Sequence, residues 1–568
     1  MRTENQPDNQ LCKQKQMTAT DVRIILFASL ILTVIGIVGA LRITQHTESR
    51  YDLDIFFHQF VVHDLPGSVL CGLILILAMV QFRRSLLPAR VFDLIDRYRW
   101  AVAVVLAGLL SIGTLTIYRN HPLCLDEFSQ LFQAKLFAAG KIWAEYPPEL
   151  LERLLPSTRN FFMPSLQTGH VITWYWPGYS LLQTPFVLIG APWLLNPLLS
   201  AGTILLIRHL AANLYPDTNS PSWAMLLTLA SPAFIVNCIS YYSMPAQLFL
   251  NLLFTVLILE ISPGRLIAAG FVGSLALLQK NPVPHFFYAL PWIIWIAARR
   301  DGWRSLIWLA VGYMPLSLFI GFGWAALRLQ FKLQNTTEGS TFWEGLHSLV
   351  VGTLTGDFMR VVYYRSTALL KLAVWAVPGL VVLALVGARR CWKDSRIKVL
   401  VFSALLTFIG YYVFWPSQGH GWGYRYFHGA WGTLPLLVCG LVAARRNGLP
   451  GKFTPLACAV GTLVVLSFVL LNGLRLYQVD SFMDRHLAQL PLLDPQRKQI
   501  CFIRPEEGYY SIDLIQNDPF LRSNTVFIKS FGPEDEKQFI DKYYPDAVPK
   551  SDSPDTRVWY IDEQQAKE

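Results

Sequence analysis

The chain has 568 residues, of which 53% are hydrophobic and only 15% are charged, and its formal net charge is +10. Soluble domains carry about 25% charged residues, so this composition excludes an ordinary soluble protein and indicates a polytopic membrane protein. The positive charge is no evidence for nucleic-acid binding, because the basic residues lie in short stretches between apolar runs, where the positive-inside rule places them.

Apolar runs of about 15–22 residues recur along the chain, and each is roughly long enough to cross a bilayer. No cleavable signal is evident, and residues 1–22 are expected to form a disordered cytoplasmic tail. We therefore predict an all-α membrane domain of about thirteen transmembrane helices. The predicted spans are 23–41, 66–82, 100–118, 193–213, 223–240, 246–261, 265–280, 284–298, 305–326, 368–388, 399–415, 429–444 and 453–473.

Basic clusters follow the second, eighth, tenth and twelfth spans, and they predict the orientation of the chain. All of them fall on one side if the amino terminus is cytoplasmic. The outward elements are then the loops 119–192 and 327–367 and the turns 241–245, 281–284 and 416–428.

Residues 177–190 are apolar but are not counted as a span. The segment is short, and counting it would put Arg299 and Arg300 on the wrong side of the membrane. We interpret it as an interfacial or re-entrant helix, which is tolerated at membrane depth where protein buries its ends. The alternative, a true span with another span miscounted, remains open.

Residues 474–568 are expected to form a small extracytoplasmic α/β domain. The sequence pattern predicts strands at 500–503, 525–528 and 558–561, and a helix over 533–544. This domain contains no evident catalytic motif.

The eight cysteines include no C-x-x-C pair, and most lie in apolar spans, which favours a packing role. Cys124 and Cys501 both fall in outward segments. A disulfide between them is a minor alternative, because sequence does not test the required geometry.

Asp126 and Glu127 follow directly after the span 100–118, at its outward end. A carboxylate at a membrane–water boundary can act as a general base on an acceptor hydroxyl, and its neighbour can raise its pKa or orient a substrate. The structural alternative is that both carboxylates only stabilise a helix predicted over 127–139, by interacting with the positive end of its dipole.

The segment 419–428 (GHGWGYRYFH) lies in an outward turn. Arg425, bracketed by Tyr424 and Tyr426, is suited to binding a phosphate, while a snorkelling arginine in an aromatic belt is the alternative. His420 and His428 are weak candidates for metal ligands, so no metal site is assigned.

Further polar residues at outward ends are candidates to line the same cavity. Lys280 ends one span just before a proline-broken stretch that leads to His285, and polar groups at such breaks often face a cavity. Tyr175 and Tyr241, in outward segments, and Arg365, in the long loop, complete the candidates.

Together these motifs resemble the GT-C superfamily of integral-membrane glycosyltransferases, in the branch of the protein O-mannosyltransferases and the lipid A aminoarabinose transferases. In that branch an Asp-Glu pair precedes A-x-x-L-x-x-G, matched here by Asp126-Glu127 and residues 134–140 (AKLFAAG). A Tyr-x-Pro-Gly segment is matched at 175–178 and a G-x-R-Y turn at 423–426. The resemblance covers roughly residues 100–473. Residues 23–99, with the first two predicted spans, look like an amino-terminal addition to the usual arrangement of the family. The turn at Met244-Pro245 departs from the pattern, which often has a histidine or charged residue there.

The resemblance implies an inverting, mannosyltransferase-like enzyme of a bacterial inner membrane, with its site on the outer face. Its donor would be a polyprenyl-phosphate-linked sugar and its acceptor a hydroxyl of a glycan, lipid or protein. It implies Asp126 as general base with Glu127 in support, and Arg425 and Lys280 as phosphate ligands. Such cations would stabilise the charge that grows on the phosphate in the transition state. No cofactor is implied with certainty; some branches use a divalent metal.

Two other functions remain open. One is an oligosaccharide ligase or polymerase with a lipid-pyrophosphate donor, and the other is a transporter of lipid-linked intermediates. A transporter is expected to carry charged residues near mid-span. Here the spans are nearly uncharged and the chemistry gathers at one face, which favours an enzyme.

Overall fold

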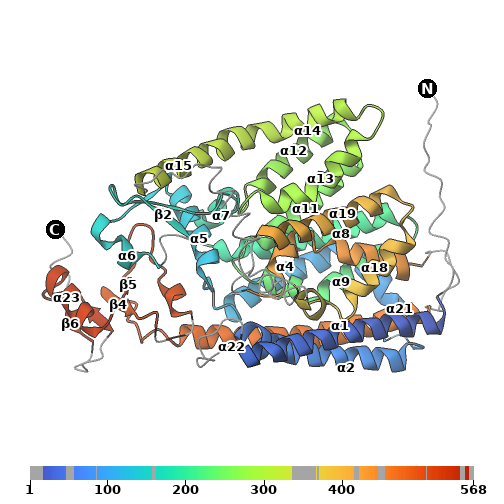
Figure 1. The fold of residues 1–568 in the computed structure, drawn as a ribbon, viewed down its shortest axis with the longest axis horizontal. Helices are drawn as coiled ribbons and strands as arrows, with labels where there is room; N and C mark the ends of the chain where they lie inside the picture. Colours follow the sequence, from blue (N-terminus) through green and yellow to red (C-terminus); the bar gives the residue numbers. More distant parts are fainter. Residues whose placement is uncertain are drawn as a thin grey trace.

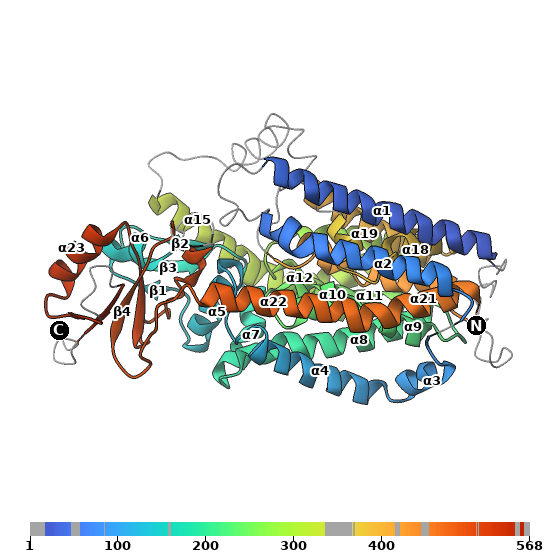
Figure 2. The same cartoon turned by 90° about the horizontal axis from the view of Figure 1, so that it is seen from below.

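The computed structural model describes residues 17–46, 57–84, 86–156, 161–335, 366, 370–414, 421–444, 454–506, 508, 510–550 and 557–561. Helices that lie side by side form a long body, and the strands gather at one end of it (Figures 1 and 2). The helices of the body are α1 (Ala19–His46), α2 (Leu65–Gln81), α3 (Ala89–Arg97), α4 (Arg99–Thr116), α8 (Leu195–Leu214), α9 (Ser220–Leu229), α10 (Pro232–Cys238), α11 (Met244–Leu259), α12 (Pro263–Leu277), α13 (Val283–Ala297), α14 (Gly302–Leu316), α15 (Gly323–Asn335), α18 (Leu380–Arg390), α19 (Ser395–Phe414), α20 (Thr433–Val442), α21 (Pro455–Leu466) and α22 (Asn472–Leu487).

Several of these helices can span a membrane. Within the described residues, six helices are long and apolar enough, and a seventh span results if the bent pair α9–α10 counts as one. Four shorter apolar helices, α11, α12, α13 and α20, fall on further predicted spans. The integral-membrane class is supported, and the total of thirteen spans stays a prediction.

Two of the spans are longer than predicted. The helical run through α21 and α22 covers Pro455–Leu487, and the run through α14 and α15 covers Gly302–Lys332. Hydropathy marks where an apolar run ends, whereas the helix continues through the polar residues that follow because nothing in them breaks it. The last span and the C-terminal segment therefore meet near residue 488 and not at 473.

The segment 177–190 forms the helix α7 (Gly178–Leu188), which has 11 residues. A helix of that length extends about 16 Å, well short of the ~30 Å hydrocarbon core. It packs on α5 (Leu125–Ala138), where the Ser180 hydroxyl donates to the Gln130 carbonyl at 2.9 Å. Its length agrees with the interfacial or re-entrant interpretation.

The strands form two sheets. The loop sheet has the antiparallel order β1 (Ala144–Glu145), β3 (His170–Thr173), β2 (Phe162–Pro164). The C-terminal sheet has the order β5 (Thr525–Lys529), β4 (Gln499–Ile503), β7 (Val558–Tyr560), β6 (Val548–Pro549), with β4 and β5 parallel and the other pairs antiparallel. The three strands and the helix expected in this region are present, the helix as α23 (Pro533–Tyr543).

The two sheets share one hydrophobic core with α5. Phe128 and Phe132 of α5 belong to the same buried cluster as Phe162 of the loop sheet and Phe502 and Phe539 of the C-terminal segment. The described part of residues 488–561, called here the C-terminal segment, is therefore packed onto the loop that contains α5 and the loop sheet, and does not stand apart from it.

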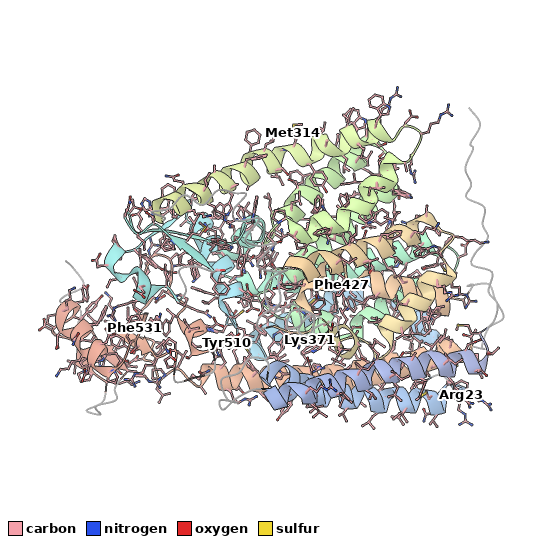
Figure 3. The ribbon with its side chains drawn as sticks, viewed as in Figure 1. Arg23, Met314, Lys371, Phe427, Tyr510 and Phe531 are labelled. Atoms are coloured by element: carbon pink, nitrogen blue, oxygen red, sulfur yellow. The ribbon has the colours of Figure 1, made fainter. Side chains whose placement is uncertain are left out.

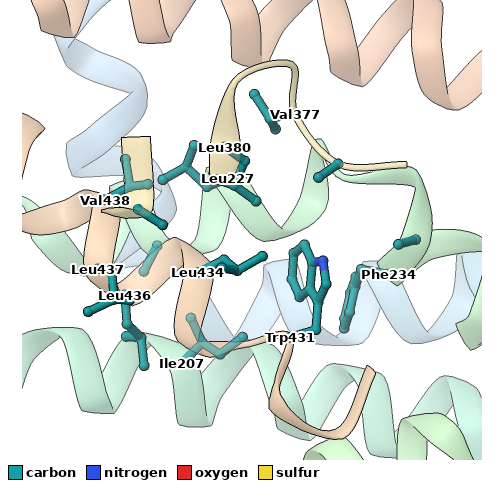
Figure 4. Close-up of a cluster of buried hydrophobic side chains, with 14 of the residues drawn as sticks. Ile207, Leu227, Phe234, Val377, Leu380, Trp431, Leu434, Leu436, Leu437 and Val438 are labelled. Carbon is teal, nitrogen blue, oxygen red and sulfur yellow. The ribbon is translucent and has the colours of Figure 1, made fainter. Parts of the chain in front are cut away.

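The core of the helical body holds the turn that begins α20. Trp431 stacks on Phe234 of α10 with ring centroids 6.3 Å apart, and Leu434 and Leu380 lie in the same cluster (Figure 4). A Cβ on Gly387 of α18 would lie 2.1 Å from the Leu437 carbonyl oxygen, so glycine allows α18 and α20 to approach closely. This packing fixes the turn 421–432 against the body.

Basic residues gather at the end of the body opposite the strands. The guanidinium groups of Arg23 and Arg83 both lie over the Phe82 ring, at 5.4 and 5.9 Å from its centroid. Arg23 and Phe531 of the C-terminal segment lie at opposite ends of the molecule (Figure 3). This pair of arginines and the strands therefore lie at opposite ends of the molecule.

Candidate active site

Four segments that are distant in sequence meet at the carboxylate of Asp126, in the first turn of α5. Its Oδ1 accepts a hydrogen bond from Lys280 Nζ at 2.8 Å, and its Oδ2 accepts one from Arg425 Nη1 at 2.8 Å. The Tyr175 hydroxyl also donates to Oδ1. The structure thus brings together four of the residues that the sequence analysis selected.

The segment 175–178 is held against the end of α12 by its backbone. The Trp176 amide donates to the Lys280 carbonyl at 3.2 Å, and the Gly178 amide donates to the Leu278 carbonyl at 2.7 Å. A Cβ on Gly178 would lie 2.6 Å from that carbonyl group, so only glycine permits the contact. This explains why a glycine ends the Tyr-x-Pro-Gly motif, and it sets Tyr175 beside Lys280, with Nζ 4.6 Å from the ring centroid.

The glycine-rich turn 421–424 shapes the position of Arg425. Gly421 and Gly423 have φ angles of 142° and 66°, which side-chain-bearing residues rarely adopt. A Cβ on Gly421 would lie 2.3 Å from Arg425 Cδ, so its absence makes room for the arginine. The guanidinium lies over the Tyr242 ring, 4.7 Å from its centroid. This contact agrees with the cation–π preference of arginine.

The charges of this cluster do not cancel. Burial alone raises the pKa of Asp126, but the charges of Lys280 and Arg425 outweigh it and hold this pKa well below its usual range. The carboxylate is therefore ionised, and one anion faces two cations. The side chains of Asp126 and Lys280 remain 14% and 18% exposed and that of Arg425 is 2% exposed, so solvent reaches the cluster beside Asp126 and Lys280.

Glu127 has a different environment from its neighbour. It is buried, and it accepts hydrogen bonds from the Tyr118 hydroxyl at 2.8 Å and from the Leu123 amide at 2.6 Å. Burial raises its pKa to about 8, against the effect of these hydrogen bonds. Near neutral pH it is mostly a protonated acid. The Trp422 indole donates to Tyr118 at 3.2 Å, which connects Glu127 to the turn that carries Arg425.

The tyrosines beside Arg425 pack against α19. The Tyr426 ring stacks on Tyr411 with centroids 4.5 Å apart, and the Tyr424 ring lies 6.2 Å from Phe408. Their predicted phosphate-binding role is not tested by these contacts and stays a prediction.

The predicted cavity-lining residues fall in three places. The Tyr241 hydroxyl donates to Asn120 Oδ1 at 2.5 Å, near the end of α4. His285 lies in a buried network between helices, bonded to Asn251 and Tyr313 at 2.7 Å each. Arg365 lies outside the described residues, as does His420.

Several residues at the site were missed by the sequence analysis. Tyr118, Tyr242 and Trp422 surround Glu127 and Arg425, but in a chain with 13% aromatic residues they formed no distinguishing pattern. Cys124 Sγ lies 3.1 Å from the Tyr242 hydroxyl. Cys124 and Cys501 are both free, so the disulfide considered between them is wrong.

A second buried ion cluster was also missed. Asp64 accepts hydrogen bonds from Lys371 Nζ at 2.5 Å and from the Trp375 indole at 2.6 Å, and Arg475 Nη1 lies 3.8 Å away. No local motif surrounds these residues, and they lie far apart in sequence. As for metals, no group of three or more His, Cys, Asp or Glu side chains forms a candidate site in the part of the chain that the structure describes.

The known proteins that are similar to this chain are found among solved structures. No family model matches the chain, and no curated protein matches it. Among solved structures, it is similar to ArnT from Cupriavidus metallidurans in the apo state, with 11% identity, a TM-score of 0.47, and coverage of 81% of this chain and 97% of ArnT. It is also similar to ArnT from Cupriavidus metallidurans bound to undecaprenyl phosphate, with 12% identity, a TM-score of 0.48, and coverage of 82% of this chain and 98% of ArnT.

ArnT is a lipid A aminoarabinose transferase of the GT-C class, the branch that the motifs of this chain resemble. At this identity and TM-score the likeness carries no functional argument. The function proposed below depends on the geometry of the site.

Proposed function

We propose that the protein is a membrane glycosyltransferase that transfers a sugar from a polyprenyl-phosphate donor to an acceptor hydroxyl, with inversion. The observation that carries this proposal is the convergence of Asp126, Tyr175, Lys280 and Arg425 into one partly accessible cluster. Charged groups at the edge of a membrane domain are costly to bury, and they usually mark a functional site.

The reaction would use the two cations for the phosphate. The acceptor oxygen forms a bond to the anomeric carbon while the bond from that carbon to the phosphate oxygen breaks. The polyprenyl phosphate leaves with the electron pair and gains negative charge. Lys280 and Arg425 stabilise this charge, so they bind the transition state more tightly than the ground state.

Asp126 would receive the proton of the acceptor hydroxyl. While it shares both cations it is a weak base, because they hold its pKa well below the usual range. A donor phosphate competes for the same N–H groups. As Lys280 and Arg425 turn to the phosphate, the pKa of Asp126 rises toward that of an ordinary carboxyl group, and the base becomes effective once the donor is bound.

The distribution of charge supports an outward-facing site. Arg23 and Arg83 lie together at one end of the body, and the segments that carry the site lie toward the strands at the other. The positive-inside rule assigns the basic end to the cytoplasm. In a bacterial inner membrane the site would then face the periplasm.

Lipid binding and transfer are tested on the full chain in nanodiscs. Undecaprenyl phosphate is the probe for binding, and a panel of polyprenyl-phosphate sugars supplies donors for transfer. We expect saturable binding that Lys280→Ala and Arg425→Ala weaken, and transfer from at least one donor. Arg208→Ala is the matched control, since Arg208 forms an ion pair with Asp96 at 2.7 Å at the basic end. Binding that all three variants leave unchanged would reject the site.

A further inference from the structure

A stripe of polar side chains runs along α11, which is otherwise apolar. Gln247, Asn251 and Thr255 follow one another at the spacing that places residues on one face of a helix. All three are buried, and the Thr255 hydroxyl lies 2.8 Å from that of Tyr288 in α13. Polar side chains within a membrane domain are costly and usually mark a function. The stripe is therefore a candidate for a role beyond packing.

Asn251 forms side-chain hydrogen bonds with two segments at once. Its Nδ2 donates to the Gly429 carbonyl at 2.9 Å, and its Oδ1 lies 2.7 Å from His285 Nδ1. Gln247 Nε2 also donates to this Oδ1, at 3.1 Å. Because an amide oxygen only accepts, the proton of the imidazole is on Nδ1. On the other side of the ring, Nε2 lies 2.7 Å from the Tyr313 hydroxyl of α14.

Each of the two segments carries one cation of the candidate site. Gly429 lies in the 3-10 helix η5 (Arg425–Ala430), which begins with Arg425. His285 lies in the first turn of α13, and Lys280 lies in the turn just before that helix. A single buried side chain, that of Asn251, thus joins the segment of Arg425 to the segment of Lys280.

The turn η5 lies close against α11. A Cβ on Gly429 would lie 2.9 Å from Gln247 Cγ and 3.2 Å from Asn251 Nδ2, so glycine permits this approach. Phe427 of the same turn is buried within the helical body (Figure 3). The bond from Asn251 to the Gly429 carbonyl therefore anchors a turn that is already enclosed by helices.

We infer that Asn251 is a positioning residue, which sets the spacing of Lys280 and Arg425 so that both contact one anionic group. Both cations lie 2.8 Å from the Asp126 carboxylate. Another group of similar width contacts both only while this spacing holds, because charge-assisted hydrogen bonds are short. The inference rests on the proposed function, in which that group is the phosphate of the donor.

The test is a double-mutant cycle on the full chain in nanodiscs, with undecaprenyl phosphate as the probe. Asn251→Ala should weaken binding by about 10-fold, the effect of leaving buried hydrogen-bond partners unsatisfied. In a Lys280→Ala background the same change should have little effect, because spacing does not matter when one cation remains. Asn472→Ala is the matched control, since Asn472 is also buried and donates to the Leu229 carbonyl at 3.0 Å.

Equal losses from Asn251→Ala in the two backgrounds would overturn the inference, because damage that does not act through the pair of cations multiplies with the loss of Lys280. Unchanged binding in the single variant would also overturn it. A conservative pair gives a second readout. The amide nitrogen of His285→Asn can take the place of Nδ1, so this variant should keep most of the affinity that His285→Ala loses. Equal losses in these two variants would contradict the inference.

Hydrogen–deuterium exchange gives a readout that needs no ligand. The amides of residues 425–430 should exchange faster in Asn251→Ala than in the wild type, and in Asn472→Ala they should not. Unchanged exchange in Asn251→Ala would overturn the inference. Faster exchange in a protein whose wild type binds no undecaprenyl phosphate would reject the proposed function and keep the role of Asn251 in holding the turn.

Discussion

Two buried clusters in this protein have the same composition, one aspartate with a lysine and an arginine, but they differ in access. In the first, the side chains of Asp126, Lys280 and Arg425 are 14%, 18% and 2% exposed. In the second, those of Asp64, Lys371 and Arg475 are 6%, 2% and 0% exposed, so the clusters differ at the aspartate and the lysine and not at the arginine. The first cluster can exchange a partner for a ligand, whereas the second is closed.

The hydrogen bonds of Arg475 show how the second cluster is closed. Its guanidinium donates to the carbonyls of His63 and Val374 at 2.6 and 2.9 Å, and to the Gln478 side chain at 2.9 Å. A Cβ on Gly67 would lie 2.1 Å from Nη2, so a glycine makes room for the group. These backbone bonds join α22 to two other segments. The role of this cluster is structural.

Trp422 lies between the two clusters. Its ring is 5.5 Å from that of His63 and 6.2 Å from that of Trp375, and its indole donates to Tyr118. The closed cluster therefore supports the turn that carries Arg425. The proposed site therefore differs from the closed cluster in the exposure of its aspartate and lysine and in the remaining hydrogen bonds of its cations, and not in charge composition.

The largest expected effect is that of Asp126→Asn. It removes the base and should lower transfer by about 100-fold or more, the usual range for general-base catalysis. Undecaprenyl phosphate should still bind, because the competing carboxylate charge is gone. Radiolabelled transfer and lipid binding are measured side by side. Asp96→Asn is the control, since Asp96 forms an ion pair with Arg208 and is also 14% exposed. Full transfer by Asp126→Asn would refute the assignment of the base.

Asp64→Asn should act on stability and not on chemistry. It leaves the buried cations Lys371 and Arg475 without their carboxylate, and removal of one partner from a buried pair costs about 3–5 kcal/mol. Unfolding in detergent, followed by heat or denaturant, measures the loss. The folded fraction should keep the wild-type affinity for undecaprenyl phosphate. A lost affinity with unchanged stability would make the closed cluster a ligand site and end the distinction between the two.

Arg425→Ala and Lys280→Ala should weaken the binding of undecaprenyl phosphate by about 10–100-fold each, the value of a charged hydrogen bond. The double variant should lose less affinity than the product of the two single fold-losses, because both cations contact the same phosphate group. Titration at two salt concentrations measures the affinities. Arg119→Ala serves as the control, since Arg119 forms exposed ion pairs with Asp480 and Asp484. Equal losses in the control would show that only net charge matters.

The smallest expected effect, counted per pH unit, is the pH dependence of stability that Glu127 contributes. Its pKa in the folded protein is raised to about 8 from the ordinary value of 4.5. Between these values the folded state binds the proton more tightly, so stability falls as the pH rises, by up to about 1.4 kcal/mol per pH unit. Glu127→Gln mimics the protonated acid and should remove this part of the fall. Melting temperatures from pH 5 to pH 9 provide the measurement, with the exposed Glu152→Gln as the control. Parallel curves for the wild type and Glu127→Gln would contradict the raised pKa.

The sequence predicted those parts of the molecule that local patterns encode. Hydropathy located apolar helices, of which six or seven can span a membrane within the described residues. Asp126, Tyr175, Lys280 and Arg425 were found because each follows or ends an apolar run within a short motif. Gly178 and Gly421 explain two of these motifs physically, since a side chain at either position would collide with its neighbours.

Contacts between distant residues were beyond the reach of these patterns. Asp64 and Lys371 are separated by 307 positions, and Arg475 donates to the carbonyl of His63, which lies 412 positions away. No single segment contains a signal for such a pair. The directions of the Tyr424 and Tyr426 rings were likewise not predictable, because they depend on α19, which packs against the turn.

The most direct test of the account is a structure of the full chain in a nanodisc with undecaprenyl phosphate bound. We predict that the phosphate lies against Lys280 and Arg425, and that both cations have moved away from the Asp126 carboxylate toward it. A phosphate bound elsewhere, with both ion pairs of Asp126 intact, would contradict the account.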